Sequence, residues 1–342
     1  MSRGYVDADG HIMENAEEFF KYFEEPWRSC DTLTPSRVVP SGDEFHTPRI
    51  RRKGIFNWSV GPEQWLEYLD KTGLEFTVLY TSAGLTCGHI VNPEWATVYA
   101  RAWNNYVFDR YLKRSPRFRA MAVIPMQDVP AAVVELRRAV NDLGMVGAYL
   151  PSNGLKRHLS AKEFWPVYEE AQKLDCPLGI HGGSYDDLGF NTFTLFPGTR
   201  ALGMPFPLAI AMTGMIQDGV WDAFPNLKVG FMEGGTSWIP LVIDRLNRER
   251  EYGELRCEKS VIDYFNSGRF YVGCEGNEGA LSYVVDLIGP QACMFASDFP
   301  HEIAMENALD EINEIEERKD LSDQHKKMIL GENAKKFYKL EQ

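Results

Sequence analysis

The sequence predicts an α/β protein of the (β/α)8 class, a closed TIM barrel with a segment inserted after its first strand. Eight short apolar stretches with strand character alternate with helical stretches along the 342 residues, and this alternation is typical of a parallel sheet. Eight units favour a closed barrel over an open doubly wound sheet. Neither G-x-G-x-x-G after the first strand nor G-x-x-x-x-G-K-[ST] occurs, so nucleotide-binding open sheets lack support. We therefore expect a single domain over residues 1–342.

The expected strands are short apolar runs bounded by glycine, proline or charged residues. In the first, which begins at Tyr5, apolar residues alternate with acidic ones, and the pattern breaks at Gly10. Asp9 and His11 should then project to the same side, because side chains two residues apart on a strand share a face. The other seven strands are expected at residues 76–81, 118–124, 146–150, 177–181, 227–233, 269–275 and 292–297.

The helices expected between these strands carry start signals. Pro130 stands at the first position of one helix, and Ser160 with Glu163 three residues later forms a capping box for another. The helices are expected at residues 94–113, 130–143, 160–174, 206–224, 237–252, 278–288, 304–318 and 322–337.

Residues 15–70 make an excursion between the first two strands, which we expect to fold over one end of the barrel as a lid. The excursion contains a dense basic cluster in an otherwise acidic chain. Two interpretations stay open for this cluster: a solvated surface loop, or an anchor for a substrate carboxylate or phosphate. The cluster consists of Arg49, Arg51, Arg52 and Lys53.

A second long loop, rich in glycine and phenylalanine, is expected at residues 184–204. Its aromatic residues, Tyr185 and Phe190 among them, fit a flat apolar substrate, and they fit lid packing equally well.

The composition favours a small molecule as the partner. With 44% hydrophobic and 13% aromatic residues the chain can bury a large core. Its net charge of −13 leaves no basic footprint for nucleic acid or an acidic membrane surface. No apolar run approaches the roughly 20 residues of a bilayer span, and the polar start is not a secretory signal pattern. The six cysteines form no C-x-x-C pair, so no disulfide framework or zinc ribbon is expected. We expect a soluble, cytoplasmic protein.

Ionisable residues follow five of the expected strands at their carboxyl ends, where barrel enzymes hold their active sites. Each residue alone has a structural explanation as a core histidine, a helix cap or a loop carboxylate. Together they would repel one another and lose hydration without a cation. A bound metal ion would remove that cost. In strand order, the residues are Asp9 and His11, His181, Glu233, Glu275, Asp298 and His301.

The order of these motifs resembles the amidohydrolase superfamily. Within it, the chain is similar to the branch of aminocarboxymuconate semialdehyde decarboxylase and related aromatic acid decarboxylases. The resemblance implies a metal-dependent (β/α)8 barrel with Asp9, His11, His181 and Asp298 as ligands. The motifs that carry it are D-x-H on strand one, a histidine before Gly-Gly on strand five, a ligand-type residue before Gly-Gly on strand six and S-D-F-P-H on strand eight.

Two departures from the family pattern add negative charge. Asp9 stands where the family usually has the first histidine of H-x-H. Glu233 stands where the decarboxylases place a catalytic histidine, and a carboxylate donates a proton at neutral pH only if its pKa is strongly raised.

The resulting donor set exceeds what one zinc ion with an open position needs. We predict one or two divalent ions, with iron or manganese favoured and zinc as the alternative. Glu233 would bridge or complete a second site. The predicted ligands are Asp9, His11, His181, Glu233 and Asp298, with Glu14, His301, Asp7 and Glu275 as further candidates.

The surplus of carboxylates predicts a metal-dependent hydrolase of an ester, thioester or amide, in which a metal-bound water attacks the acyl carbon. Asp298, His301 and Glu233 are the predicted catalytic residues, with Asp298 or His301 moving the proton. The basic cluster would suit a phosphate-bearing acyl carrier such as coenzyme A.

Two alternatives stay open. The resemblance implies a non-oxidative decarboxylase of an aromatic or conjugated acid, with one metal ion. A different class is a catalytically inactive barrel that serves as a binding scaffold. In either case a homodimer is expected, with the helices at residues 209–219 and 321–337 as candidate interface surfaces.

Overall fold

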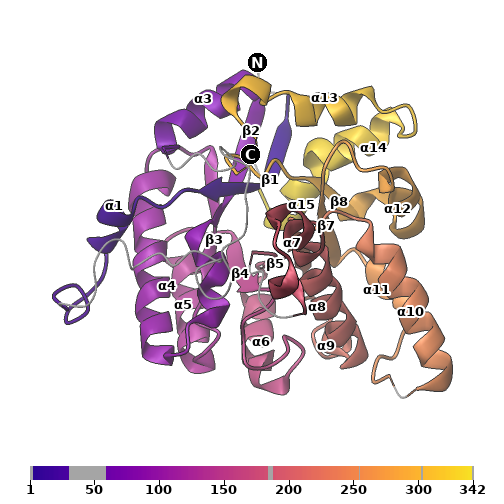
Figure 1. Cartoon of the computed structure of the whole chain (residues 1–342), viewed down its shortest axis with the longest axis horizontal. Coiled ribbons are helices and arrows are strands. Elements are labelled where there is room, and N and C mark those ends of the chain that lie inside the picture. The colour runs from indigo at the N-terminus through magenta and orange to yellow at the C-terminus, as the bar shows by residue number, and fades with distance from the viewer. Residues whose placement is uncertain (1–2, 31–58, 184–187, 254, 302, 341–342) are drawn as a thin grey trace.

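The structure is a computed structural model that describes residues 3–30, 59–183, 188–253, 255–301 and 303–340. Its eight strands are parallel and follow one another in chain order around the barrel (Figure 1). The predicted (β/α)8 fold is therefore confirmed. The strands are β1 (Tyr5–Ile12), β2 (Leu74–Thr81), β3 (Phe118–Val123), β4 (Gly147–Pro151), β5 (Leu178–His181), β6 (Val229–Met232), β7 (Phe270–Cys274) and β8 (Cys293–Phe295).

Helices lie between successive strands and cover the outside of the barrel (Figure 1). In α5, for example, Asp128 accepts a hydrogen bond from the Ala131 amide at the start, and Ala132, Leu136 and Ala139 are the buried face. The longer helices are α3 (Pro62–Thr72), α4 (Pro93–Val107), α5 (Val129–Asn141), α6 (Trp165–Leu174), α8 (Pro205–Gln217), α10 (Trp238–Tyr252), α12 (Leu281–Ile288) and α13 (Asp310–Glu317). The shorter ones are α1 (Ala16–Phe20), α7 (Phe196–Gly203), α9 (Val220–Ala223), α11 (Val261–Phe265), α14 (Asp323–Lys327) and α15 (Asn333–Tyr338).

The barrel closes through backbone hydrogen bonds between β1 and the segment that follows β8. The His11 amide donates to the Phe299 carbonyl at 2.8 Å, and the Asp298 amide donates to the Asp9 carbonyl at 3.0 Å. These backbone bonds place the two acidic strand ends beside each other, although 289 residues separate them along the chain. No helix in the described part of the chain is both long and apolar enough to cross a membrane.

The sequence pattern predicted a break at Gly10, but strand β1 continues to Ile12. The irregularity lies between Asp7 and Gly10, where β1 gains one residue against β2, which is the signature of a bulge. A side chain at Gly10 would collide with the Trp65 ring, since its Cβ would lie 2.4 Å from Trp65 Cη2. The glycine therefore lets α3 pack closely on β1.

Several helical boundaries also differ from the prediction. The predicted loop at 184–204 holds α7 and the 3-10 turn η4 (Phe190–Thr192). The predicted helix at 206–224 is interrupted at Gly219, whose φ of 71° ends α8 before α9 begins. The capping box at Ser160 is not formed, because its hydroxyl donates to Asp218 at 2.6 Å and α6 starts later, at Trp165.

Candidate metal centre

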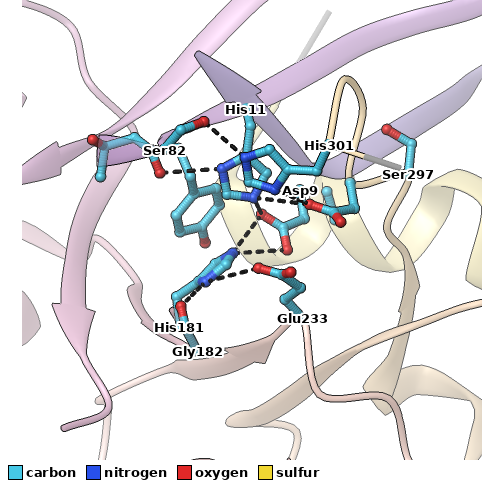
Figure 2. A network of polar contacts seen from close by, with 12 residues as sticks. Asp9, His11, Ser82, His181, Gly182, Glu233, Ser297 and His301 are labelled. Carbon is cyan, nitrogen blue, oxygen red and sulfur yellow. Dashed lines mark hydrogen bonds and ion pairs between the residues drawn. The ribbon is translucent and has the colours of Figure 1, made fainter. Parts of the chain in front are cut away.

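The structure brings six of the predicted site residues together at the carboxyl ends of the strands (Figure 2). Asp9, His11 and His181 form one group of ligand-type side chains. A second group shares His11, and within each group the donor atoms lie within 4.8 Å of one another. The members of the second group are His11, Glu233, Asp298 and His301.

The two deepest histidines are oriented by backbone carbonyls. His11 Nδ1 lies 3.1 Å from the Thr81 carbonyl, and His181 Nδ1 lies 2.6 Å from the Gly182 carbonyl. A carbonyl only accepts, so Nδ1 carries a proton in each ring and Nε2 faces the group of donors. This is the arrangement that orients histidine ligands in metal sites.

Several donor atoms face one another without hydrogen bonds. Among the described residues, Asp9 Oδ2, His11 Nε2 and Glu233 Oε2 are buried and make none. His11 Nε2 lies 3.6 Å from Asp9 Oδ1 and 3.4 Å from Asp298 Oδ1. His181 Nε2 lies 3.2 Å from each Asp9 carboxylate oxygen and is hydrogen-bonded to Oδ1. Buried polar atoms are normally satisfied. These atoms therefore fit a shared divalent ion, around which ligands at about 2.1 Å would be separated by roughly 3–3.5 Å.

Burial and crowding shift the pKa values in this group. Burial raises the pKa of Asp9, and burial with the nearby Asp298 raises that of Glu233 to about 8. Burial acts against the charge on Asp298 too, but His301 holds the pKa of this carboxyl well below its usual range. Burial lowers the pKa of His181, but the Asp9 carboxylate more than offsets this and raises it to about 9. Protonated groups and negatively charged carboxylates therefore lie close together in this site.

Glu233 and Asp298 both adopt left-handed backbone conformations, with φ of 55° and 52°. This region is uncommon for residues other than glycine and costs about 1–3 kcal/mol. Each residue follows the end of its strand, β6 or β8, and the turn aims its carboxylate at the neighbouring histidines. The strained conformation at both positions is typical of functional sites.

His301 lies beside the donors but has partners at both ring nitrogens. Its Nδ1 lies 2.7 Å from Asp298 Oδ1, and its Nε2 lies 2.8 Å from the Ser82 hydroxyl. Its ring stacks on His11 with 4.0 Å between centroids. His301 therefore orients Asp298 and His11. The role of Ser82 was not predicted, although its place directly after β2 was a signal.

Arg200 of α7 is the functional residue that sequence reasoning missed. Its Nη2 lies 3.2 Å from Glu233 Oε1 and 3.2 Å from Asp298 Oδ2 (residues of two different strand ends). A signal was available, since Arg200 is the only lysine or arginine in residues 184–204. The guanidinium supplies part of the positive charge beside these carboxylates, which the sequence predicted to come from metal ions alone.

Three further candidate ligands lie outside the donor groups. Asp7 accepts hydrogen bonds from Thr77 and Ser297, and Glu14 accepts from Thr81, Ser82, Ala83 and Trp103. Glu275 is exposed after β7, and its amide donates instead to the neighbouring Glu278. The structure thus does not bring Asp7, Glu14 or Glu275 into the centre.

The predicted substrate contacts are placed only in part. Phe190 is buried in η4, and its carbonyl lies 3.4 Å from the Thr199 hydroxyl, which donates to it. Arg49, Arg51, Arg52 and Tyr185 lie outside the described residues.

Fold and site together define an enzyme of the metal-dependent (β/α)8 class. The amidohydrolase family model matches residues 58–340, most of the chain. The chain therefore belongs to the amidohydrolase family, as the sequence resemblance predicted.

The chain is similar over most of its length to two characterised decarboxylases. It is 28% identical over 285 residues to 2-amino-3-carboxymuconate-6-semialdehyde decarboxylase of Dictyostelium discoideum, with 82% of this chain and 77% of the relative covered. It is also 28% identical over 293 residues to gamma-resorcylate decarboxylase of Polaromonas sp. (strain JS666), with 80% and 85% covered.

A solved structure with the same fold is that of dihydroxybenzoic acid decarboxylase from Polaromonas sp. JS666, with bound manganese and the inhibitor 2-nitroresorcinol. The TM-score is 0.72 at 22% identity, over 99% of this chain and 98% of that one. The donor groups fit the predicted one or two divalent metal ions, and the related structure holds manganese.

The prediction of an acyl-bond hydrolase is wrong. These relatives are decarboxylases and not hydrolases of an ester, thioester or amide. The prediction rested on a surplus of carboxylates that would need a second ion. Arg200 pairs with two of those carboxylates, so part of the surplus is balanced within the protein.

Proposed function

We propose that the protein is a non-oxidative decarboxylase of an aromatic or conjugated carboxylic acid that uses one divalent metal ion, with manganese favoured. The observation that carries the proposal is the buried donor group of Asp9, His11 and His181, with Asp298 Oδ1 3.4 Å from the shared His11, in a chain similar over most of its length to two decarboxylases. The manganese bound in the Polaromonas structure supports the choice of metal.

Asp9, His11, His181 and Asp298 would hold the metal ion. When bound, the ion supplies positive charge that orients the substrate carboxylate and stabilises charge on the ring. The protein fixes this arrangement beforehand, because the Thr81 and Gly182 carbonyls orient the two imidazoles. His301, between Asp298 and Ser82, holds the Asp298 carboxylate in place.

Glu233 is the proposed proton donor. It lies across from His181, with 3.6 Å between Glu233 Oε2 and His181 Nδ1, and its side chain is 4% exposed. In the reaction, the bond between the ring carbon and the carboxylate breaks, its electron pair stays on the carbon, and carbon dioxide leaves. The Glu233 proton then adds to that carbon. A buried carboxyl can do this near neutral pH because burial favours its protonated form.

Release of carbon dioxide from 2,6-dihydroxybenzoate by the manganese-loaded protein tests the proposal. We expect release by the wild type, one solvent deuteron in the product ring when the reaction runs in D2O, and a loss of at least about 100-fold in kcat for Glu233→Gln. Metal-depleted wild type is the matched control. Hydrolysis of p-nitrophenyl acetate at the metal centre, without carbon dioxide release from any aromatic acid of a test panel, would reject the proposal.

We also propose that the chain is a homodimer through the apolar surface of α7 and α8. Leu202 of α7 and Phe206 and Ile210 of α8 are exposed large apolar side chains, and α8 is apolar on nearly all sides. The second expected surface, at 321–337, instead packs Ile329 and Phe337 into the barrel core. Sedimentation velocity of the full chain at several concentrations distinguishes a dimer from a monomer.

A further inference from the structure

Side-chain exposure orders the metal centre from its floor to its mouth. His11 and His181 are 0% exposed and Asp9 is 1% exposed, whereas Glu233 is 4%, Asp298 14% and Arg200 18% exposed. A molecule that enters from solvent therefore meets Arg200 and Asp298 before it reaches the deeper donors. Among the described residues, no other lysine or arginine makes an ion pair with the carboxylates of this centre.

The net charge of the centre depends on Arg200. With Glu233 protonated, as the proposed proton donor must be, Asp9 and Asp298 carry the two negative charges that a divalent ion neutralises. Without Arg200 the loaded centre would then be neutral and would not attract an anionic acid. With Arg200 the centre carries one positive charge, which favours an anion in this low-dielectric site.

The position of Arg200 depends on α7, which has only a small apolar contact of its own. Phe196 and Met204, at and just beyond the two ends of the helix, form a buried cluster separate from the main core. Met204 Sδ would lie 2.7 Å from a Cβ on Gly182, so α7 rests directly against the end of β5. The ion pairs of Arg200 with Glu233 and Asp298 are thus a main link between α7 and the centre.

We propose that Arg200 receives the carboxylate of the incoming substrate and makes the centre selective for anionic acids. The proposal rests on the proposed function in taking the substrate to be a carboxylate. With Asp298 as a metal ligand, its carboxylate would hold the guanidinium less strongly, and Arg200 would pair with the substrate anion. Guanidinium groups bind carboxylates through two parallel hydrogen bonds, which an ammonium group cannot reproduce.

This pairing acts on binding and not on bond cleavage. The carboxylate loses its charge as carbon dioxide forms, so an arginine paired with it stabilises the bound ground state at least as much as the transition state. Removal of the arginine should therefore raise KM and leave kcat unchanged or higher.

The experiment compares an acid with its uncharged amide by calorimetry on manganese-loaded full-length protein. The ligands are 2,6-dihydroxybenzoate and 2,6-dihydroxybenzamide, and the variants are Arg200→Gln and Arg200→Lys. Arg138→Gln is the matched control, because Arg138 is 19% exposed and ion-paired with Glu135 on the outer helix α5. Manganese content per chain is measured for every variant.

We expect Arg200→Gln to weaken binding of the acid about 10- to 100-fold, with Arg200→Lys intermediate and amide binding unchanged. Arg138→Gln should match the wild type. Unchanged acid binding in Arg200→Gln, no measurable acid binding by the wild type, or loss of manganese from Arg200→Gln would each overturn the proposal. Arg200-dependent binding of an acid that is not decarboxylated would support this inference while rejecting the proposed function.

Discussion

Strand β1 carries two aspartates, Asp7 and Asp9, that are both 0% exposed and differ completely in their surroundings. Asp7 accepts four hydrogen bonds, from the Asp9 and Ser297 amides and the Thr77 and Ser297 hydroxyls. Asp9 makes one, between its Oδ1 and His181 Nε2, and its Oδ2 accepts none. Burial alone therefore does not identify a metal ligand; the number of donors around a buried carboxylate does.

The bulge in β1 produces this difference. On a regular strand Asp7 and Asp9 would share a face. The extra residue between Asp7 and Gly10 breaks that relation, and Asp7 Oδ2 lies 2.9 Å from where a Cβ on Gly10 would stand. Asp7 thus shares the Gly10 side of the strand and joins β1 to β2 and to Ser297, while Asp9 faces the metal centre.

The largest expected effect on stability is that of Asp7→Ala. Loss of this acceptor leaves four buried donors without a partner. We therefore expect the free energy of unfolding of the metal-free protein to fall by about 3 kcal/mol. Urea denaturation checks this. Asp9→Ala is the matched variant, with the same residue type, strand and burial, and it should change the stability by less than about 1 kcal/mol. Equal losses in the two variants would refute the distinction between a structural aspartate and a ligand.

Manganese should stabilise only one of the two variants. A ligand that binds only the folded state at 100 times its Kd stabilises that state by about 2.7 kcal/mol. We expect this gain for the wild type and for Asp7→Ala, and none for Asp9→Ala, because only Asp9 belongs to the donor group. Denaturation with manganese and then with excess chelator measures the gain and its loss. Stabilisation of Asp9→Ala by manganese would show that the ion binds elsewhere.

The barrel could be predicted from the sequence because its evidence is local and repeated. Each strand, such as β5 or β7, is a short apolar run, and its position in the barrel follows from chain order. A residue at the carboxyl end of a strand lies at the same end of the barrel as the other strand ends. For this reason the sequence could place together Asp9, His11, His181, Glu233 and Asp298 before their contacts were known.

What could not be predicted depends on contacts between distant segments. Asp7 and Glu14 have the same residue types as the ligands, and only the bulge and the donors from β2 and its following turn separate them from the centre. Arg200 lies in a stretch whose glycine and phenylalanine content indicated a loop. Its ion pairs with two strand ends are tertiary, and this omission led to the wrong prediction of hydrolysis.

The smallest expected effect comes from removing a single donor to Asp7. Thr77→Val keeps the shape of the buried side chain but removes its hydroxyl, which lies 2.9 Å from Asp7 Oδ2. The Ser297 hydroxyl still donates to the same oxygen, so the loss should be about 1 kcal/mol. Thr72→Val is the control, since its buried hydroxyl donates to a carbonyl of its own helix and its loss should be smaller. A loss for Thr77→Val as large as that of Asp7→Ala would mean that the four donors act as one cooperative unit.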